Sequence, residues 1–296
     1  MKDDLLLGGM EGGGTKFVCA VGKRTGEILF ETRFETTTPD ETLGKAIAFF
    51  RRHSPEAIGL ACFGPLDLDP RSPTYGSITT TPKEHWANID VIGLFRTELA
   101  VPLAFDTDVN TAAYGEFRAI QGELVSSLVY LTIGTGIGAG IIIDGKIVHG
   151  LAHPETGHLR LPHEKTRDPF GGTCPFHQDC FEGLASGTAM AARWGTSAED
   201  IPDDHPAWSL EAHYISSALV NVILTLSPEI IILGGGVMSR QHIFPLIQTM
   251  TLDLLAGYNP SALIKQQIKE YIVPPRLGKR SGILGAIALA DAISRE

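Results

Sequence analysis

Residues 130–149 hold the feature that most constrains the fold: two apolar, β-branched runs joined by a turn of small residues. The runs are residues 130–133 and 141–143, and the turn between them contains Gly134, Thr135, Gly136, Gly138 and Gly140. This pattern predicts a strand, a glycine turn and a second strand. Asp144-Gly145 then predicts a tight turn into residues 146–148, because both residues accept a positive φ. We expect three antiparallel strands, with a first turn open enough for a phosphate to reach backbone N–H groups.

A rougher copy of this unit lies near the start of the chain. Residues 5–7 lead through two glycines and Met10 into the sequence Glu-Gly-Gly-Gly-Thr-Lys at residues 11–16. A strand pattern at 17–21 and a Thr25-Gly26 turn into residues 27–30 complete the copy. Because the parts follow in the same order, we expect two similar lobes that face one ligand.

Two well-known glycine motifs fit less well. The dinucleotide-binding fingerprint opens a helix, whereas the chain after Gly134-x-Gly136-x-x-Ala139 continues as a strand. A Walker loop needs Gly-Lys-Ser/Thr before a helix, whereas Gly14-Thr15-Lys16 leads into the strand pattern FVCAV. Glycine-rich hairpins without a ligand are the remaining alternative.

Length and charge narrow the class of protein. The 296 residues suffice for one large or two ordinary domains, and 43% hydrophobic with 20% charged residues is a globular composition. A net charge of −10 without a basic run disfavours binding to nucleic acid or anionic membranes. Phosphate affinity must then come from backbone amides or a metal ion. The chain begins MKDD and shows no apolar run of membrane-span length, so we expect a cytoplasmic protein without a signal peptide.

Strand and helix patterns alternate through the first half of the chain. Thr38-Pro-Asp-Glu41 predicts a capping box, and Leu43, Ile47 and Phe50 then mark one helix face. A strand at 57–62 ends near Gly64-Pro65, which predicts a turn at the sheet edge where ligands bind. Residues 69–86 indicate a long loop, followed by a helix at 89–99, a strand at 101–105 and a helix at 111–120.

The second half shows a third glycine turn. We expect helices at 187–194 and 207–226, then a strand at 229–233 that ends in Gly234-Gly235-Gly236, then a helix near residue 243. Strand, glycines and helix in this order favour a phosphate, although a plain tight turn has the same pattern. The small-residue-rich helix at 281–293 predicts close packing against another element.

Asp106 and Asp108 lie where a predicted strand meets a helix N-terminus. Such a polar junction can hold an ionised acid. The simpler alternative is that one of them is only the N-cap of the helix.

Cys174-x2-His177-x2-Cys180 has the spacing of a metal knuckle, and His158 is available as a fourth ligand. Four protein ligands would make a closed, structural zinc site. A Cys174–Cys180 disulfide is the rival, and spacing alone leaves His149 or His163 possible in place of His158. The other cysteines, Cys19 and Cys62, fit buried thiols.

The motifs GGGTK, DTDVN, LTIGTGIGAG, PETGH, the Cys-His-Cys knuckle and LGGGV occur in this order, and with them the chain resembles the ROK family of sugar kinases, most closely its bacterial zinc-containing fructokinase branch. The resemblance implies an α/β fold of the actin-like ATPase (ribonuclease H-like) type, with ATP and sugar in a central cleft between two lobes. Residues 1–119 would form the N-terminal lobe, to which the final helix 281–296 returns, and residues 120–280 the C-terminal lobe with the knuckle. It also implies a homodimer.

The same resemblance assigns roles to single residues. Asp108 matches the general base that accepts the proton of the sugar hydroxyl. The sites that match phosphate and adenosine binding are Gly13, Gly14, Thr15, Lys16, Thr132, Gly134, Thr135, Gly136, Gly187, Thr188, Gly234, Gly235 and Gly236. The sugar site would comprise Gly64, Thr107, Asp108, Glu155, His158 and Glu182, and the zinc ligands His158, Cys174, His177 and Cys180. Zinc would orient the loop that bears Glu155 and Glu182. ATP with Mg²⁺ would supply the γ-phosphoryl group for the 6-hydroxyl of D-fructose.

Three departures from the family pattern bear on the substrate. Thr107 replaces an asparagine that contacts the sugar in glucose-type members, Glu11 replaces an aspartate, and the knuckle has a histidine where most members have a third cysteine. Thr107 disfavours glucose, and the knuckle favours fructose. A mannokinase or glucokinase of the same family is the alternative, as is a non-catalytic sugar-sensing regulator. We do not expect a DNA-binding repressor, because the first glycine motif already begins at Gly8 and the chain is acidic.

Overall fold

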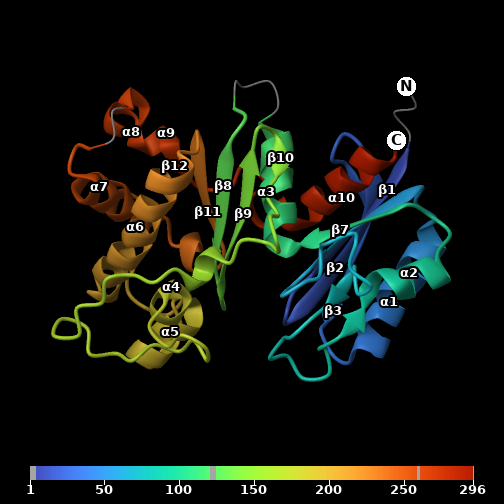
Figure 1. The fold of residues 1–296 in the computed structure, drawn as a ribbon, viewed down its shortest axis with the longest axis horizontal. Helices are drawn as coiled ribbons and strands as arrows, with labels where there is room; N and C mark the ends of the chain where they lie inside the picture. Colours follow the sequence, from blue (N-terminus) through green and yellow to red (C-terminus); the bar gives the residue numbers. More distant parts are fainter. Residues whose placement is uncertain (1–4, 121–124, 259–260, 296) are drawn as a thin grey trace. The chain divides into compact units, whose positions relative to one another are not determined.

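The computed structural model describes residues 5–120, 125–258 and 261–295, so the expectation for the MKDD terminus lies outside the described residues. The chain divides into two compact units: residues 1–123, 146–154 and 279–296 form one, and residues 124–145 and 155–278 the other. The described residues form two five-stranded sheets: one lies wholly in the first unit, and all strands of the other except Lys146–Ile147 lie in the second unit (Figure 1). Residues 146–154 belong to the first unit, whereas the resemblance places them in the C-terminal lobe. The lobe boundaries stay a prediction.

The first unit begins with two hairpins and ends with the last helix of the chain. Its main elements are β1 (Leu6–Gly12), β2 (Lys16–Lys23), β3 (Ile28–Glu35), α1 (Pro39–His53), β4 (Ala57–Cys62), β5 (Ser77–Ile78), β6 (Ile89–Asp90), α2 (Val91–Glu98), β7 (Leu103–Thr107), α3 (Asp108–Ala119) and α10 (Ser281–Ile293). The strand order in its large sheet is β3-β2-β1-β4-β7. β1 is antiparallel to β2 and parallel to β4, which is parallel to β7.

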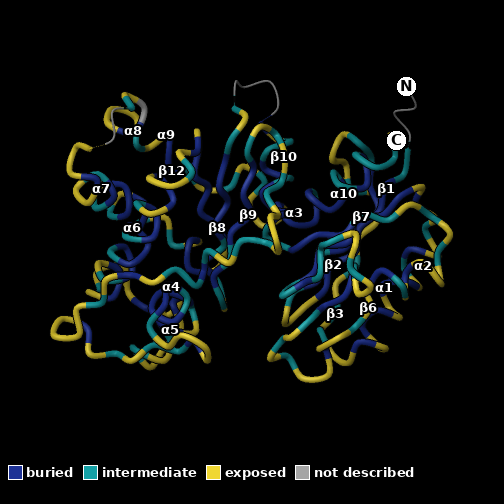
Figure 2. Tube along the Cα trace, in the orientation of Figure 1, coloured by how far each residue is buried: buried dark blue, intermediate teal, exposed yellow. Residues whose placement is uncertain are grey.

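Side chains of this sheet point alternately to two buried faces, as a sheet covered on both sides requires. On one face Phe17, Cys19 and Val21 of β2 share a core with Leu43 and Phe50 of α1, and on the other Val18 and Ala20 share a core with Ile283 and Ile287 of α10. Figure 2 shows the buried residues concentrated along these central strands, while the edge strand β3 is largely exposed.

Glycines let α10 approach its neighbours, as its small-residue composition predicts. A Cβ on Gly59 of β4 would lie 2.0 Å from the Ala286 carbonyl oxygen, and one on Gly285 would lie 1.8 Å from the carbonyl oxygen of Thr111 in α3. No side chain fits at either distance. The close packing of α10 against β4 and α3 therefore depends on these two residues.

The second unit repeats this plan. Its elements are β8 (Leu128–Ile133), β9 (Ile137–Ile143), a 3₁₀ turn (Thr156–His158), α4 (Phe181–Ala185), α5 (Gly187–Trp194), α6 (Ala207–Leu226), β11 (Ile230–Gly234), 3₁₀ turns at Val237–Ser239 and Gln241–Ile243, α7 (Phe244–Leu255), α8 (Ala262–Gln266), α9 (Ile268–Tyr271) and β12 (Ile272–Val273). With the short strand β10 (Lys146–Ile147), its sheet has the order β10-β9-β8-β11-β12. β8 and β9 are antiparallel, and β8, β11 and β12 are parallel.

The two sheet orders correspond strand for strand, which confirms the repeat predicted from the glycine turns. In each, a run of three strands joined by hairpins is followed by two parallel strands. Asp144 and Gly145 have φ angles of 51° and 73°, as predicted for the tight turn between β9 and β10.

Several sequence expectations need correction. The capping box does not form: the Thr38 hydroxyl makes no capping bond, and the Glu41 carboxylate accepts hydrogen bonds from the Thr37 hydroxyl and from Lys45 Nζ. The helix expected at 89–99 begins at Val91, since Asp90 is its N-cap and accepts a bond from the Gly93 amide. The two-residue strands β5, β6 and β12 were not expected, because two residues cannot show a hydrophobic period.

Helix α6 is an exception to the expectation that no apolar run reaches the length of a membrane span. Among the described residues, α6 is long and apolar enough by length and composition, but 56% of its apolar window is buried inside the protein. Its side chains Trp208, Tyr214 and Leu219 are at most 2% exposed. These properties are those of a core helix, so α6 is weak evidence for a membrane span.

Candidate active-site residues and metal centre

The turn from β7 into α3 brings the two predicted aspartates together. Thr107 is the N-cap of α3, and its hydroxyl oxygen accepts a hydrogen bond from the Asn110 amide at 3.1 Å. Asp106 Oδ1 accepts from the Thr107 amide at 2.8 Å and from Asn110 Nδ2 at 2.7 Å. The N-cap alternative for Asp106 or Asp108 is therefore wrong: the cap is Thr107, and Asp106 braces the turn.

Asp108 is the first residue of α3, and its Oδ1 accepts a bond from the Val109 amide at 2.9 Å. The positive end of the helix dipole favours an ionised carboxylate at this position. Burial, and after it the charge of Asp108, raises the pKa of the Cys62 thiol at the end of β4. Asp108 is half-buried, whereas Thr107 is only 2% exposed.

Residues 146–154 supply two histidines to the same end of the first sheet. His149 Nε2 lies 2.8 Å from Asp106 Oδ2, and this hydrogen bond, opposed by burial, raises the pKa of His149. His153 Nε2 accepts a bond from the Leu66 amide at 3.3 Å, and its ring lies 3.4 Å from where a Gly64 Cβ would stand. Neither contact has a local sequence signal, so neither was predicted from the sequence.

The first glycine turn is held at its base and open at its tip. A Cβ on Gly12 would lie 2.7 Å from the Phe17 ring, so β1 must end in glycine here. Gly13 donates its N–H to the Lys16 carbonyl at 2.9 Å, and its own carbonyl accepts from the Thr36 hydroxyl at 2.7 Å. Gly14, Thr15 and Lys16 are exposed, and a Cβ on Gly14 would have no heavy atom within 4 Å.

Glu11, just before this turn, faces the N-terminus of α10. It accepts a hydrogen bond from the Ile283 amide, and burial raises the pKa of its carboxyl group. Its carboxyl carbon lies 2.5 Å from where a Gly282 Cβ would stand, so this approach needs a glycine at residue 282. Glu11, which replaces the aspartate of the family pattern, therefore contacts the N-terminus of α10.

The second unit gathers the remaining glycine motifs around the β8–β9 turn. Gly134 donates to Gly136 at 2.9 Å across the turn, and its carbonyl accepts from the Gly187 amide at the start of α5 at 2.6 Å. The Thr188 hydroxyl donates to the Thr135 carbonyl at 2.7 Å. A Cβ on Gly235 would lie 2.4 Å from the Ile133 carbonyl oxygen, and one on Gly134 3.8 Å from the Gly236 amide. The structure therefore brings together Thr132, Gly134, Thr135, Gly136, Gly187, Thr188, Gly234, Gly235 and Gly236.

The predicted sugar-binding carboxylates of this unit lie in different surroundings. Glu182, in the first turn of α4, accepts a hydrogen bond from the Ile137 amide at 2.9 Å, where β9 begins. Glu155 precedes the 3₁₀ turn and is exposed. A Cβ on Gly157 would lie 2.0 Å from the Ile137 carbonyl oxygen, so the PETGH segment packs closely against the same residue of β9.

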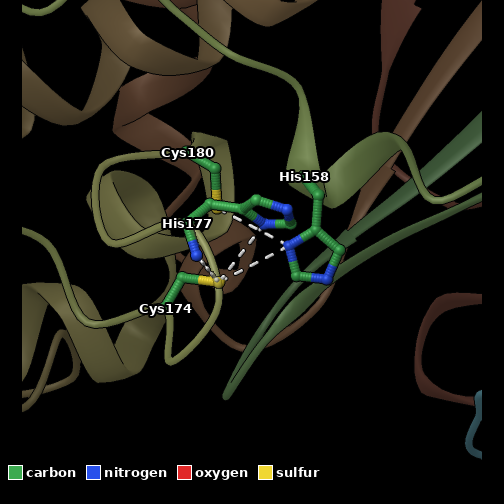
Figure 3. A group of neighbouring side chains, drawn as sticks. All are labelled: His158, Cys174, His177 and Cys180. Atoms are coloured by element: carbon green, nitrogen blue, oxygen red, sulfur yellow. Dashed lines mark hydrogen bonds between the residues drawn. The ribbon is translucent and has the colours of Figure 1, made fainter.

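The four predicted metal ligands converge (Figure 3). The ligand atoms of His158, Cys174, His177 and Cys180 all lie within 4.8 Å of one another. His158 Nδ1 lies 3.7 Å from Cys174 Sγ and 3.5 Å from Cys180 Sγ, and His177 Nδ1 lies 3.7 Å from Cys174 Sγ. Tetrahedral zinc with ordinary bond lengths to sulfur and nitrogen separates such ligand atoms by about 3.6 Å. The geometry fits this metal.

The alternatives left open by spacing are resolved. All four cysteines, each within the described part of the chain, carry free thiols, so the Cys174–Cys180 disulfide is absent. His149 pairs with Asp106, and His163 contacts Asp179 and the Asp168 carbonyl oxygen, which leaves His158 as the fourth member.

The loop around the cluster is fixed by neighbouring groups. Arg160 donates to the His177 carbonyl and to Asp179, both at 2.7 Å. Burial is the largest cause that raises the pKa of the Cys180 thiol, to about 11. A cation at the centre of the cluster would favour the thiolate form that binds metals.

Comparison with known proteins agrees with these motifs. Residues 7–293 match the sequence profile of the ROK family. The chain is 47% identical over 285 residues to a putative fructokinase of Bacillus subtilis, covering 96% of this chain and 95% of that one. It is 43% identical to a fructokinase of Streptococcus mutans, covering 98% of each. A ROK family glucokinase of Streptomyces griseus, solved with glucose and AMPPNP, has a TM-score of 0.78 and 25% identity and covers 97% of this chain and 99% of its own. The fold is that of the actin-like ATPases, and the chain belongs to the ROK family.

Proposed function

We propose that the protein is an ATP-dependent hexose kinase that transfers the γ-phosphoryl group of ATP to the 6-hydroxyl of D-fructose. The observation that carries this proposal is the near full-length identity of 47% and 43% to two proteins named as fructokinases. The structural relative named as a glucokinase is only 25% identical. The substrate proposal therefore follows the more similar relatives.

Asp108 is the proposed general base. Its place at the N-terminus of α3 favours the carboxylate, and its half-buried side chain leaves it able to meet a hydroxyl group. Phosphoryl transfer needs positioning and charge neutralisation more than covalent chemistry. Asp108 would accept the proton of the primary hydroxyl as that oxygen attacks the γ-phosphorus.

Backbone groups and Mg²⁺ are proposed to hold the nucleotide phosphates. The exposed residues Gly14, Thr15 and Lys16 offer N–H groups and one cation in the first unit. In the second unit the turn at Gly134–Gly136 and the glycines at the end of β11 support the same role, since Gly235 has a φ of 92° and the missing side chains of Gly134 and Gly236 allow a close approach. Mg²⁺ would neutralise charge on the phosphate oxygens when bound with ATP.

Zinc is the proposed ligand of the cluster formed by His158, Cys174, His177 and Cys180. A closed site with four protein ligands leaves no position for substrate, so its role would be structural. Residues 155–158 and α4 adjoin the cluster in sequence and both pack against Ile137. Zinc would therefore orient Glu155 and Glu182 toward sugar hydroxyls while taking no part in the transfer.

A homodimer in the cytoplasm, without nucleic acid or membrane partners, completes the proposal. The net charge of −10 supports the exclusion of nucleic acid. Light scattering coupled to gel filtration measures the mass of the assembly, and a value near that of one chain, 31.8 kDa, would contradict the dimer.

ADP release coupled to a spectroscopic readout tests the activity with fructose, mannose and glucose in parallel. We expect kcat/KM for fructose to exceed that for glucose by at least about tenfold, with mannose second, because one unpaired buried polar group costs about 1–3 kcal/mol. Equal or better use of glucose would refute fructose and leave the kinase intact. Sugar binding without ADP release from any hexose would favour a sugar sensor.

A further inference from the structure

The turn that presents Asp108 is braced by a side chain from a distant part of the chain. Asp106 is 4% exposed and divides its carboxylate between two directions. Oδ1 accepts from the Thr107 amide and from Asn110 Nδ2, while Oδ2 lies 2.8 Å from His149 Nε2. An ionised carboxylate only accepts hydrogen bonds, so His149 must donate from Nε2. The brace spans 43 residues of sequence.

The two residues that donate to Asp106 Oδ1 lie at the N-terminus of α3. Thr107, which bonds to Asp106 through its amide, is the N-cap of the helix, and Asp108 follows it directly. Asn110 Oδ1 is buried without a hydrogen-bond partner among the described residues, so its amide group is held through Nδ2 and Asp106. Without His149, Oδ2 would lose its charge-assisted bond in a nearly buried place, and the carboxylate could rotate away from the Thr107 amide.

We infer that His149 is a positioning residue for phosphoryl transfer, which acts through Asp106 to hold Asp108 in place at the start of α3. The inference rests on the proposed role of Asp108 as general base. His149 itself is assigned no contact with the reacting atoms.

Substitution at His149 is compatible with folding. Its side chain is 41% exposed and lines a cavity of about 420 Å³ together with Tyr75, Phe105 and Leu151. Truncation to alanine therefore widens an existing cavity and opens no new void in the core. The brace can be removed while the sheet and α3 stay intact.

The test compares steady-state kinetics of the wild type with His149→Ala, His149→Gln, Asp106→Asn and the double variant His149→Ala/Asp106→Asn. We expect His149→Ala to lower kcat by about 10- to 100-fold, since a displacement of about 1 Å costs up to that much. The KM for ATP should stay within about twofold, because the variant leaves nucleotide contacts alone. Glutamine places an amide donor near the position of Nε2 and should recover most of the loss. His53→Ala is the matched control, since that ring stacks on Phe30 at 4.1 Å, and its kcat should equal that of the wild type.

The double variant should be no slower than the slower single variant, because both substitutions remove the same brace. Losses that multiply would overturn the inference, as would His149→Ala within about threefold of the wild-type kcat. If His149→Ala melts at a lower temperature than the wild type, its low kcat could reflect lost stability, and His149→Gln separates the two effects. A His149→Gln variant that melts like the wild type but does not recover kcat also overturns the inference. These outcomes do not refute the proposed function as long as two other results hold. The wild type must phosphorylate a hexose, and Asp108→Asn must be inactive. A wild type inert toward every hexose would refute the function and the inference together.

Discussion

Gly285→Ala should separate α10 from α3 and destabilise the first unit. The added Cβ would lie 1.8 Å from the Thr111 carbonyl oxygen and 2.7 Å from its carbon. Carbon and carbonyl oxygen rarely approach closer than about 3.3 Å, so the helices must part by about 1.5 Å. The obstacle is backbone, which cannot rotate away as a flexible side chain can. Overpacking costs about 1–3 kcal/mol, and a backbone obstacle places the cost in the upper half of that range. The helix propensity of alanine returns about 1 kcal/mol at most, so the net loss should be about 1–2 kcal/mol.

Gly44→Ala is the matched control, since the substitution is the same and the position is again inside a helix. Gly44 lies on the exposed side of α1, and its Cβ would meet no heavy atom within 4 Å. Here only helix propensity acts, so we expect a gain of about 0.5–1 kcal/mol. The two variants should thus shift stability in opposite directions.

Thermal unfolding followed by circular dichroism measures both effects. With an unfolding entropy of about 2.1 cal/mol/K per residue, a change of 1 kcal/mol moves the melting temperature of a 296-residue chain by roughly 1.5–2 °C. Gly285→Ala should therefore lose about 2–4 °C and Gly44→Ala gain about 1–2 °C. Because Thr111 lies one helical turn from Asp108, Gly285→Ala should also lower kcat, whereas Gly44→Ala should leave it unchanged. A Gly285→Ala variant as stable as the parent would refute the reasoning from close approach.

Three further predictions address the proposed chemistry. Asp108→Asn should keep the fold and ATP binding but lose about 10²–10⁴-fold in kcat, because general-base catalysis contributes that much, and turnover within a few-fold of the parent would place the base elsewhere. Elemental analysis of protein purified without chelators should find about one zinc per chain, as a closed four-ligand site requires, and a metal-free preparation with full activity would contradict the zinc proposal. The pKa of His149 is raised by Asp106, so its stabilising contribution is fully present below about pH 6.5 and is lost as the pH rises through the raised value. The melting temperature of the wild type minus that of His149→Gln should therefore shrink between pH 6 and pH 9. Nearby groups do not reverse this sign: Asp69 stays ionised beside Arg71 with a pKa of about 2, and the pKa of Tyr75 is raised. A melting-temperature difference between the two proteins that grows with pH would contradict a stabilising His149–Asp106 pair.

Local patterns were sufficient for the parts of the fold that depend on neighbouring residues. The continuous apolar runs of β2 and β4 predict buried strands. Asp144-Gly145 predicts its own turn because few other pairs accept two positive φ angles. The glycine and alanine content of α10 predicts close packing without naming the partner. Its partners, β4 and α3, are far away in sequence and became visible only in the structure.

Contacts between distant residues were beyond sequence reasoning. The His149–Asp106 pair and the His153–Leu66 bond join segments separated by 43 and 87 residues, and no spacing rule predicts either. The fourth metal ligand was open for the same reason, since three histidines lay at acceptable distances along the chain. The missing capping box is a local difference: the Glu41 carboxylate accepts a hydrogen bond from Thr37, the residue before the N-cap Thr38.

The sequence argument from Thr107 about sugar specificity did not include the hydrogen bond that its hydroxyl makes within the protein. The sequence comparison set one hydroxyl of threonine against the two polar groups of asparagine, as if both were free to meet a sugar. In the structure the hydroxyl oxygen already accepts the Asn110 amide bond that caps α3, and the side chain is 2% exposed. What threonine can still offer a ligand is its hydroxyl hydrogen, whereas an asparagine that capped the helix with its carbonyl would keep an NH₂ group to donate. The two residues therefore differ by one donor, and a sugar that needs two donors at this position is the one that Thr107 would disfavour.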